Sequence, residues 1–239
     1  MARYTVKLIN RKEIAEGTMA FYFEKPAGFS FVAGQFCEIT LINPPETDGE
    51  GNSRQFSIAS APHEPRIMIA TRMRDTAFKR VLKNLPLGSA VIFEGPYGDF
   101  VLHENVTRPA VFLIGGIGIT PVRSMLIVAA QEHKPHKLFL FYSNRRPEDA
   151  PFLSELQELQ SKNSNYTFIG TMTEMDKSQQ TWTGKTGYVN AEMVKKYISE
   201  PNAVYYLVGP AAMVGAMRRV TRDLGIDPDM VRSEDFTGY

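Results

Sequence analysis

The chain has 239 residues, of which 43% are hydrophobic and 22% charged, and its 27 Lys and Arg residues nearly balance its 26 Asp and Glu residues. A net charge of +1 argues against a nucleic-acid-binding protein with a broad phosphate-neutralising surface. The single cysteine, Cys37, excludes an internal disulfide, a four-cysteine zinc site and a protein-ligated iron–sulfur cluster.

The N-terminal residues lack the apolar segment of a signal peptide, and no apolar run approaches the ~20 residues that a membrane helix needs. We therefore expect a cytoplasmic protein with no membrane partner. Cys37 lies in an alternating run, which favours a half-buried strand thiol over a catalytic nucleophile. The sequence contains no cluster of metal ligands, so no metal site is predicted.

Residues 1–107 consist of short segments rich in β-branched and aromatic residues, separated by Gly and Pro. This spacing predicts an antiparallel barrel or sandwich. One helix interrupts the strands, with Thr76 as its N-cap and an apolar face that includes Phe78 and Leu82. The strands are expected at residues 5–9, 19–23, 36–42, 55–59, 67–71 and 90–93.

From residue 108 onward, buried-type strands alternate with helices, which predicts a parallel, doubly wound sheet. We place a domain boundary near residues 107–109, giving domains 1–107 and 108–239. The helices are expected at residues 121–131, 152–159, 193–198 and 211–224, with strands at 110–114, 137–142, 166–172, 203–208 and 230–232.

The strongest local motif is LIGGIGITPV at residues 113–122, in which an apolar strand runs into a Gly-rich turn and then into a helix. We expect Thr120 at the N-cap and Pro121 at the first helical position. Such a turn can hold a pyrophosphate, because glycines allow close approach and the helix dipole favours an anion. On spacing alone, a plain tight turn remains an alternative, because Pro121 replaces the third glycine of the dinucleotide fingerprint.

Three further motifs accompany this turn: RQFSIAS at residues 54–60, EGPYGD at 94–99 and LVGPAAM at 207–213. Each has a plain structural alternative: a rim arginine with satisfied core serines, a turn, and a strand–helix connection. In their order and spacing, the four motifs resemble those of the ferredoxin–NADP(+) reductase family, and the ending EDFTGY resembles that of related flavin reductases. The resemblance covers essentially the whole chain and implies a flavin-binding β-barrel followed by a nicotinamide-binding α/β domain.

In the first half, the resemblance implies that Arg54 pairs with the flavin phosphate or pyrophosphate and that Phe56, where many relatives have Tyr, lies against the isoalloxazine ring. Ser57 would hydrogen-bond near flavin N5. The remaining flavin-binding residues implied by the resemblance are Gln55, Ile69, Ala70 and Thr71 on strands, and Thr76 and Ala77 at the helix start.

In the second half, the resemblance implies a nicotinamide site with Thr120 nearest the nicotinamide. Val208 replaces the Cys that many relatives carry before Gly-Pro. At the chain end, Glu234, Phe236 and Tyr239 would approach the flavin, although Tyr239 can equally be a frayed terminus. The other dinucleotide-binding residues implied are Gly116, Gly118, Gly209, Pro210 and Met213. Independently of the resemblance, Ser143, Arg145 and Arg146 follow the next strand, and the charges of the two arginines favour the 2′-phosphate of NADPH.

The resemblance therefore implies a flavin-dependent NAD(P)H oxidoreductase, in which hydride passes from the nicotinamide to flavin N5. FAD is favoured over FMN, and NADPH over NADH. Electrons would leave to a separate acceptor: a ferredoxin, a flavodoxin, a haem protein or a small molecule. The alternative is a non-catalytic flavin-binding electron-transfer or partner-docking subunit of the same fold, which Val208 and Phe56 keep open. The sequence does not indicate an oligomeric state.

Overall fold

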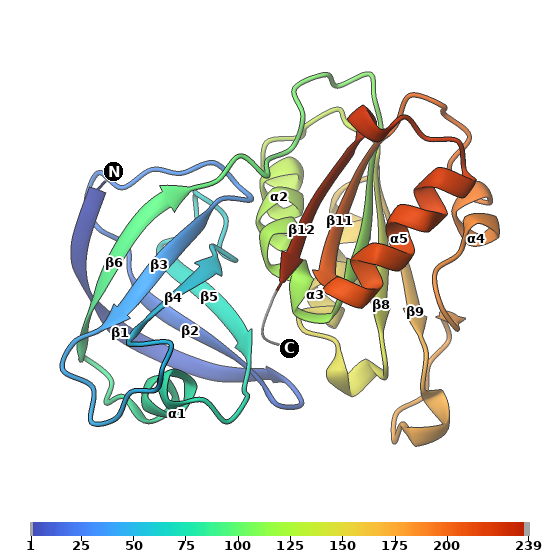
Figure 1. Cartoon of the computed structure of the whole chain (residues 1–239). Helices are drawn as coiled ribbons and strands as arrows, with labels where there is room; N and C mark the ends of the chain where they lie inside the picture. The colour runs from blue at the N-terminus through green and yellow to red at the C-terminus, as the bar shows by residue number, and fades with distance from the viewer. Residues whose placement is uncertain (1, 237–239) are drawn as a thin grey trace.

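The computed structural model describes residues 2–236, which form two six-stranded sheets lying side by side (Figure 1). The first sheet is antiparallel and the second is parallel throughout. We call residues 2–97 the barrel half and residues 110–236 the α/β half. This architecture confirms the predicted fold, an antiparallel barrel followed by a doubly wound α/β sheet.

The barrel half has the strand order β4-β3-β6-β1-β2-β5 and an apolar core between its strands. Alternate strand residues such as Phe21 and Phe23 point into that core, as a period of two requires. The predicted cap is present: the Thr76 side chain accepts a hydrogen bond from the Lys79 N–H at 3.4 Å. The elements are β1 (Ala2–Ala15), β2 (Thr18–Glu24), β3 (Phe36–Leu41), β4 (Ser53–Ser57), β5 (Arg66–Arg72), α1 (Ala77–Asn84) and β6 (Ala90–Tyr97).

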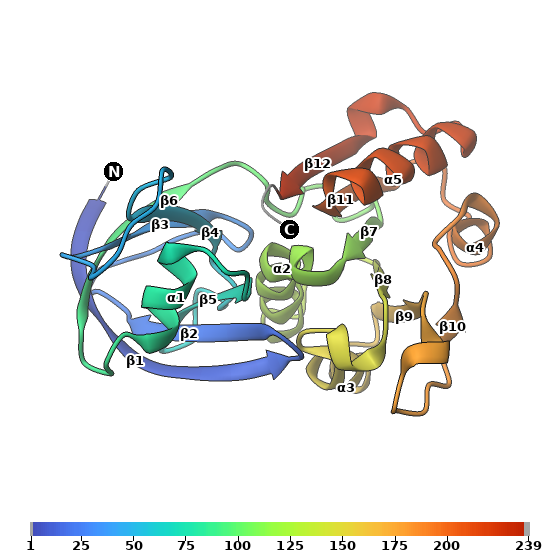
Figure 2. The ribbon, with the colours of Figure 1, turned by 60° about the horizontal axis from the view of Figure 1, so that its bottom comes forward.

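The α/β half has the strand order β10-β9-β8-β7-β11-β12, with β7 buried along its whole length. Phe112 and Ile114 face α2 and α3, whereas Val111 and Leu113 face α4 and α5 on the opposite side (Figure 2). The elements are β7 (Ala110–Gly115), α2 (Ile119–Gln131), β8 (Leu138–Asn144), α3 (Leu153–Lys162), β9 (Tyr166–Met172), β10 (Lys185–Thr186), α4 (Ala191–Lys195), β11 (Val204–Pro210), α5 (Ala211–Asp223) and β12 (Val231–Phe236).

The topology positions a binding site, because β7 is the point where the chain direction across the sheet reverses. Strands β8 to β10 lie on one side of β7, and β11 and β12 lie on the other. The turns that follow β7 and β11 therefore diverge at the carboxyl edge of the sheet, which is where open α/β sheets bind ligands. In Figure 1 this edge is the lower end of the parallel sheet, and the barrel half lies beside the sheet with α2 between them.

Several elements differ from the sequence-based expectation: β6 and β12 extend further than expected, to Tyr97 and Phe236, β10 was not expected, and β1 and α2 have other bounds. Strand β1 extends to Ala15 because its polar end pairs with β2, for example Glu13 with Met19, although that end has no apolar alternation. Helix α2 begins at Ile119 with Gly118 as its N-cap, after a short 3-10 turn, so the N-cap at Thr120 was wrong. The Thr120 hydroxyl instead donates a hydrogen bond to the Ile117 carbonyl at 3.0 Å.

Residues 98–109 join the two halves and are anchored to the parallel sheet through His103. The Tyr206 hydroxyl lies 2.8 Å from the His103 backbone nitrogen and 3.0 Å from its Nδ1. His103 Nε2 lies 3.0 Å from the Arg108 carbonyl, and His136 Nε2 lies 2.9 Å from the His103 carbonyl. The connection between the halves is therefore held by buried hydrogen bonds.

Among residues 2–236, no helix has both the length and the apolar character required to span a membrane.

Candidate functional site

A cavity of about 930 Å³ lies between the two halves. This volume is typical of sites for cofactors and other organic ligands. Residues of both halves line the cavity, so its shape depends on how the two halves are placed relative to each other. Ten of the residues singled out from the sequence line it: Arg54, Gln55, Phe56, Ser57, Ala70, Thr71, Thr76, Thr120, Glu234 and Phe236.

Strands β4 and β5 form the barrel wall of the cavity, and they line it with both polar and apolar side chains. Ser57 and Thr71 are both buried at the lining, while Phe56 packs its ring 5.9 Å from that of Phe78 on α1. Ile69 lies outside the cavity, because its side chain points into the barrel core, and Ala70 faces the cavity instead. The wall therefore combines a flat apolar surface with nearby hydroxyl groups.

Three cations that the sequence analysis did not single out gather where β5 leads into α1. Arg72, Arg74 and Lys79 line the cavity, and among the described residues none of them forms an ion pair with an acidic side chain. Lys79 Nζ donates to the Arg72 carbonyl at 2.8 Å. Burial lowers the pKa of Lys79, and the charges of Arg74 and Arg54 lower it further.

This cluster suits an anionic group such as a phosphate or pyrophosphate. Cations without an ion-pair partner among the described residues, beside the first turn of an eight-residue helix, attract and orient phosphate oxygens. The sequence signal was available, because three cations bracket the capping Thr76 within eight positions, but no single motif contains them.

Arg54 is engaged with its own loop. Its guanidinium pairs with Asp48 at 3.2 Å and with Glu50 at 2.8 Å. The other Asp48 oxygen accepts the Ala77 N–H at 3.1 Å, at the start of α1. Burial raises the pKa of Asp48, but the two backbone N–H groups and Arg54 outweigh this and lower it overall. Arg54 and the Ala77 N–H, which were both expected to bind a phosphate, are therefore both engaged by Asp48 in this structure.

The glycine turn after β7 packs against the turn after β11. A Cβ on Gly118 would lie 2.6 Å from the Val208 carbonyl oxygen, so this glycine is required for close approach of the two chain segments. Gly116 adopts φ +52° with open space around it. The cavity is lined only at the end of this turn, by Ile117 and Thr120 among the described residues.

The β11 turn lies beside the cavity wall rather than on it. The Met213 sulfur would be 2.1 Å from a Cβ on Gly115, and Gly209 packs against the same sulfur. Gly209, Pro210 and Met213, like Gly116 and Gly118, are thus gathered at the carboxyl edge of β7 and β11 without lining the cavity. The structure brings the two glycine motifs together, as the resemblance implied.

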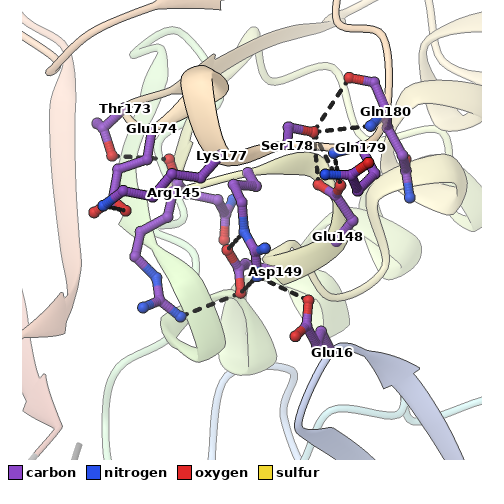
Figure 3. A network of polar contacts seen from close by, with 12 residues as sticks. Glu16, Arg145, Glu148, Asp149, Thr173, Glu174, Lys177, Ser178, Gln179 and Gln180 are labelled. Atoms are coloured by element: carbon purple, nitrogen blue, oxygen red, sulfur yellow. Dashed lines mark hydrogen bonds and ion pairs between the residues drawn. The ribbon is translucent and has the colours of Figure 1, made fainter.

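The two arginines after β8 belong to a network centred on Asp149, which has Arg145 and Glu16 on either side (Figure 3). Arg146 pairs with Asp149 at 2.8 Å and with Glu16 of the barrel half at 2.8 Å. Arg145 pairs with Asp149 at 3.1 Å, and 53% of its side chain is exposed. Ser143 pairs in register with Gly115. These residues lie outside the main cavity.

Glu234 lines the cavity from β12, next to Phe236. Burial raises the pKa of Glu234 to about 7, and the negative charge of Asp99 contributes. This carboxyl can therefore exchange a proton near neutral pH. Tyr239, expected at the same place, lies outside the described residues.

Comparison with known proteins identifies relatives of both halves. Residues 112–219 match the family model of the oxidoreductase NAD-binding domain. The chain is 28% identical over 223 residues to a glycine betaine monooxygenase reductase subunit of Chromohalobacter salexigens, with 92% of this chain and 60% of that protein aligned. It is 28% identical over 244 residues to ferredoxin–NADP reductase B of Sorangium cellulosum, covering 98% and 97% of the two chains.

Solved structures extend the similarity to the complete fold. A ferredoxin NADP+ reductase from Neisseria gonorrhoeae with bound FAD and NADP superposes with a TM-score of 0.81 at 19% identity, covering 98% of each chain. Several curated relatives are longer, and the chain spans about half to three fifths of their length. The aligned parts include both the barrel and the α/β architecture.

Proposed function

The chain belongs to the ferredoxin–NADP(+) reductase-like family, and from this premise we propose that it is an FAD-dependent NAD(P)H oxidoreductase. The observation that carries the proposal is the cavity between the halves, with three cations at its barrel end that form no ion pair with another described residue and a glycine turn at its α/β end. A flavin bound there supplies the redox chemistry, accepting hydride from a nicotinamide at N5 and passing electrons onward.

Each wall of the cavity has a separate task. Arg72, Arg74 and Lys79 would bind the flavin's phosphate groups. Ser57 would donate a hydrogen bond to the ring system, and Thr120 would orient the nicotinamide from the opposite wall. Phe56 would provide an apolar surface for the ring. The chain therefore acts mainly by holding two planar groups in contact and limiting the access of water.

The choice of FAD over FMN is supported by the number of cations at the barrel end. A single phosphate needs fewer positive charges than the three that line the cavity there. The Neisseria gonorrhoeae relative, whose structure contains FAD and NADP, has the same fold. FAD is accordingly the flavin we propose, and either NADH or NADPH serves as the reductant.

We propose that the electrons leave to a separate acceptor in the cytoplasm. The printed names of the relatives include a monooxygenase reductase subunit and a ferredoxin–NADP reductase, which support an oxygenase component, a haem protein or a ferredoxin-like protein as that acceptor. A non-catalytic electron-transfer subunit remains the second candidate, because Val208 stands where many relatives carry a Cys.

The proposal is tested by anaerobic addition of NADH and of NADPH to the purified protein loaded with FAD. We expect the flavin absorption to bleach with at least one of them. A flavin that binds but never bleaches would support the second candidate, and a protein that binds no flavin would overturn both.

The role of the three cations in binding the flavin phosphates is tested by combining Arg72→Gln, Arg74→Gln and Lys79→Gln. We expect the FAD dissociation constant to rise at least about tenfold, because charge-assisted hydrogen bonds to the phosphates are lost. The matched control is Arg66→Gln with Lys83→Gln, since these exposed cations lie on the same strand and helix but do not line the cavity. Equal effects of the two sets would contradict the assignment.

A further inference from the structure

A buried arginine of α2 connects the two halves of the molecule. Arg123 lies one turn after Thr120, on the helix that separates the barrel from the parallel sheet (Figures 1 and 2). Only 6% of its side chain is exposed. A buried guanidinium is stable only when its donors are satisfied and its charge is compensated. The hydrogen-bond partners of Arg123 therefore show which segments it connects.

Arg123 is shared between a carboxylate of each half. Its Nη1 and Nη2 donate to Glu64 of the barrel half at 2.9 and 3.2 Å. Its Nε and Nη2 donate to Glu155 of α3 at 2.7 and 2.6 Å. Nη1 also donates to the Ala59 carbonyl at 2.7 Å. The guanidinium therefore bridges α3 of its own half and the segment that follows β4.

The barrel side of this contact is itself well fixed. Glu64 accepts the Ala61 N–H at 2.5 Å, and the Ser124 hydroxyl donates to the Ser60 carbonyl at 2.7 Å. Burial raises the pKa of Glu64, but hydrogen bonds and charge from Arg123 lower it overall. Glu64 is therefore a carboxylate at neutral pH, and residues 59–64 are clamped to α2 at several points.

The contacts of Arg123 and Ser124 with residues 59–64, which we call the clamp, lie close in sequence to both walls of the cavity. Ala59 is two residues after Ser57, and Arg123 is three residues after Thr120. Ser57 and Thr120 line the cavity from opposite halves. A shift of the clamp would therefore move one wall relative to the other, while leaving the cation cluster at α1 in place.

We propose that Arg123, through Glu64 and the Ala59 carbonyl, is a positioning residue that fixes the separation of the Ser57 and Thr120 walls and thereby the contact between flavin and nicotinamide. This inference rests on the proposed function. Hydride transfer requires the reacting atoms to approach within about 3–3.5 Å, and small misplacements reduce its rate steeply. Arg123 itself does not line the cavity.

Glu64 and Glu155 provide a matched pair of variants. Each accepts two hydrogen bonds from the same guanidinium, and their side chains are similarly exposed, at 29% and 38%. Only Glu64 belongs to the other half. We compare Glu64→Gln combined with Ser124→Ala, which weakens the contact between halves, with Glu155→Gln, which weakens a contact within the α/β half.

The first measurement needs no bound flavin. Spin labels are placed at Leu87→Cys and Tyr188→Cys, which are 57% and 79% exposed in different halves, while the native Cys37 is buried. Double electron–electron resonance then gives the distance distribution between the halves. We expect it to broaden in Glu64→Gln/Ser124→Ala and to match the parent in Glu155→Gln. Identical distributions in all three proteins would overturn the inference.

The second measurement is stopped-flow bleaching of the bound flavin at saturating nicotinamide. We expect the limiting rate to fall at least about tenfold in Glu64→Gln/Ser124→Ala, with the dissociation constants of FAD and nicotinamide unchanged. An unchanged limiting rate, or an equal fall in Glu155→Gln, would overturn the positioning role. If the parent protein binds flavin but never bleaches, the proposed function fails, and the distance measurement still decides whether the clamp sets the geometry.

Discussion

Glu234 places a titrating carboxyl in the cavity, and its consequence for stability has a definite sign. The pKa of Glu234 is about 7 in the folded protein, against an ordinary value of 4.5. The folded state therefore binds a proton more tightly than the unfolded state. The stabilising contribution is complete below pH 4.5 and is lost as the pH rises through about 7.

We therefore expect Glu234→Gln, which stays neutral, to remove this dependence. Between pH 5 and pH 8, the free energy of unfolding of the parent should fall relative to that of the variant by about 1–2 kcal/mol, allowing for solvent screening. Urea unfolding at several pH values measures this difference. Asp99→Asn should move the transition to lower pH, because it removes a like charge. A difference that does not vary with pH would contradict the assignment.

The two adjacent arginines after β8 have different ion-pair partners, so we expect them to affect nucleotide preference differently. Arg146 forms ion pairs with both Asp149 and Glu16, whereas Arg145 forms one ion pair, with Asp149, and has a half-exposed side chain. We expect Arg145→Ala to raise the Michaelis constant for NADPH about tenfold relative to that for NADH, because a charge facing the 2′-phosphate is lost. Arg146→Ala is the control and should change both constants equally. Steady-state kinetics with both nucleotides would reject the idea if the variants behaved alike.

At the scale of elements, the turn between β7 and α2 contains two glycines that are required for different reasons. Gly116 has a left-handed backbone with free space, so Gly116→Asn should cost less than about 1 kcal/mol of stability. At Gly118 even a methyl group would strike the Val208 carbonyl. We expect Gly118→Ala to cost about 1–3 kcal/mol and to lower the melting temperature more than Gly116→Asn. The reverse order would show that the turns pack differently.

Most elements could be predicted because their periodicity reflects burial. The run Ala110–Gly115 is buried on both faces, and Phe78 and Leu82 face the barrel core from α1. The polar end of β1 could not be predicted, because pairing with β2 defines it and no apolar pattern accompanies it. The start of α2 was misplaced, because Thr120 bonds back to the turn instead of capping the helix.

At the scale of the whole molecule, the change from antiparallel to parallel sheet was predictable, whereas the contacts between the halves were not. Arg146 and Glu16 are separated by 130 residues, and Arg123 and Glu64 by 59. No local pattern marks such pairs. The cation cluster was missed for a different reason, since Arg72, Arg74 and Lys79 lie within eight positions but belong to no single motif. The domain boundary near residue 107 stays a prediction.

The shared cavity also has a consequence for how the molecule comes apart. The barrel half has an apolar core of its own, but the cluster around α2 also includes Ala33 and Ala61 of the barrel half, so the two units of unfolding share part of their core. A ligand held between the walls contacts both units and is released when either one opens. Its binding energy therefore stabilises both units at once and couples their melting. Removal of a cofactor bound between the walls should accordingly lower the melting temperature of both units.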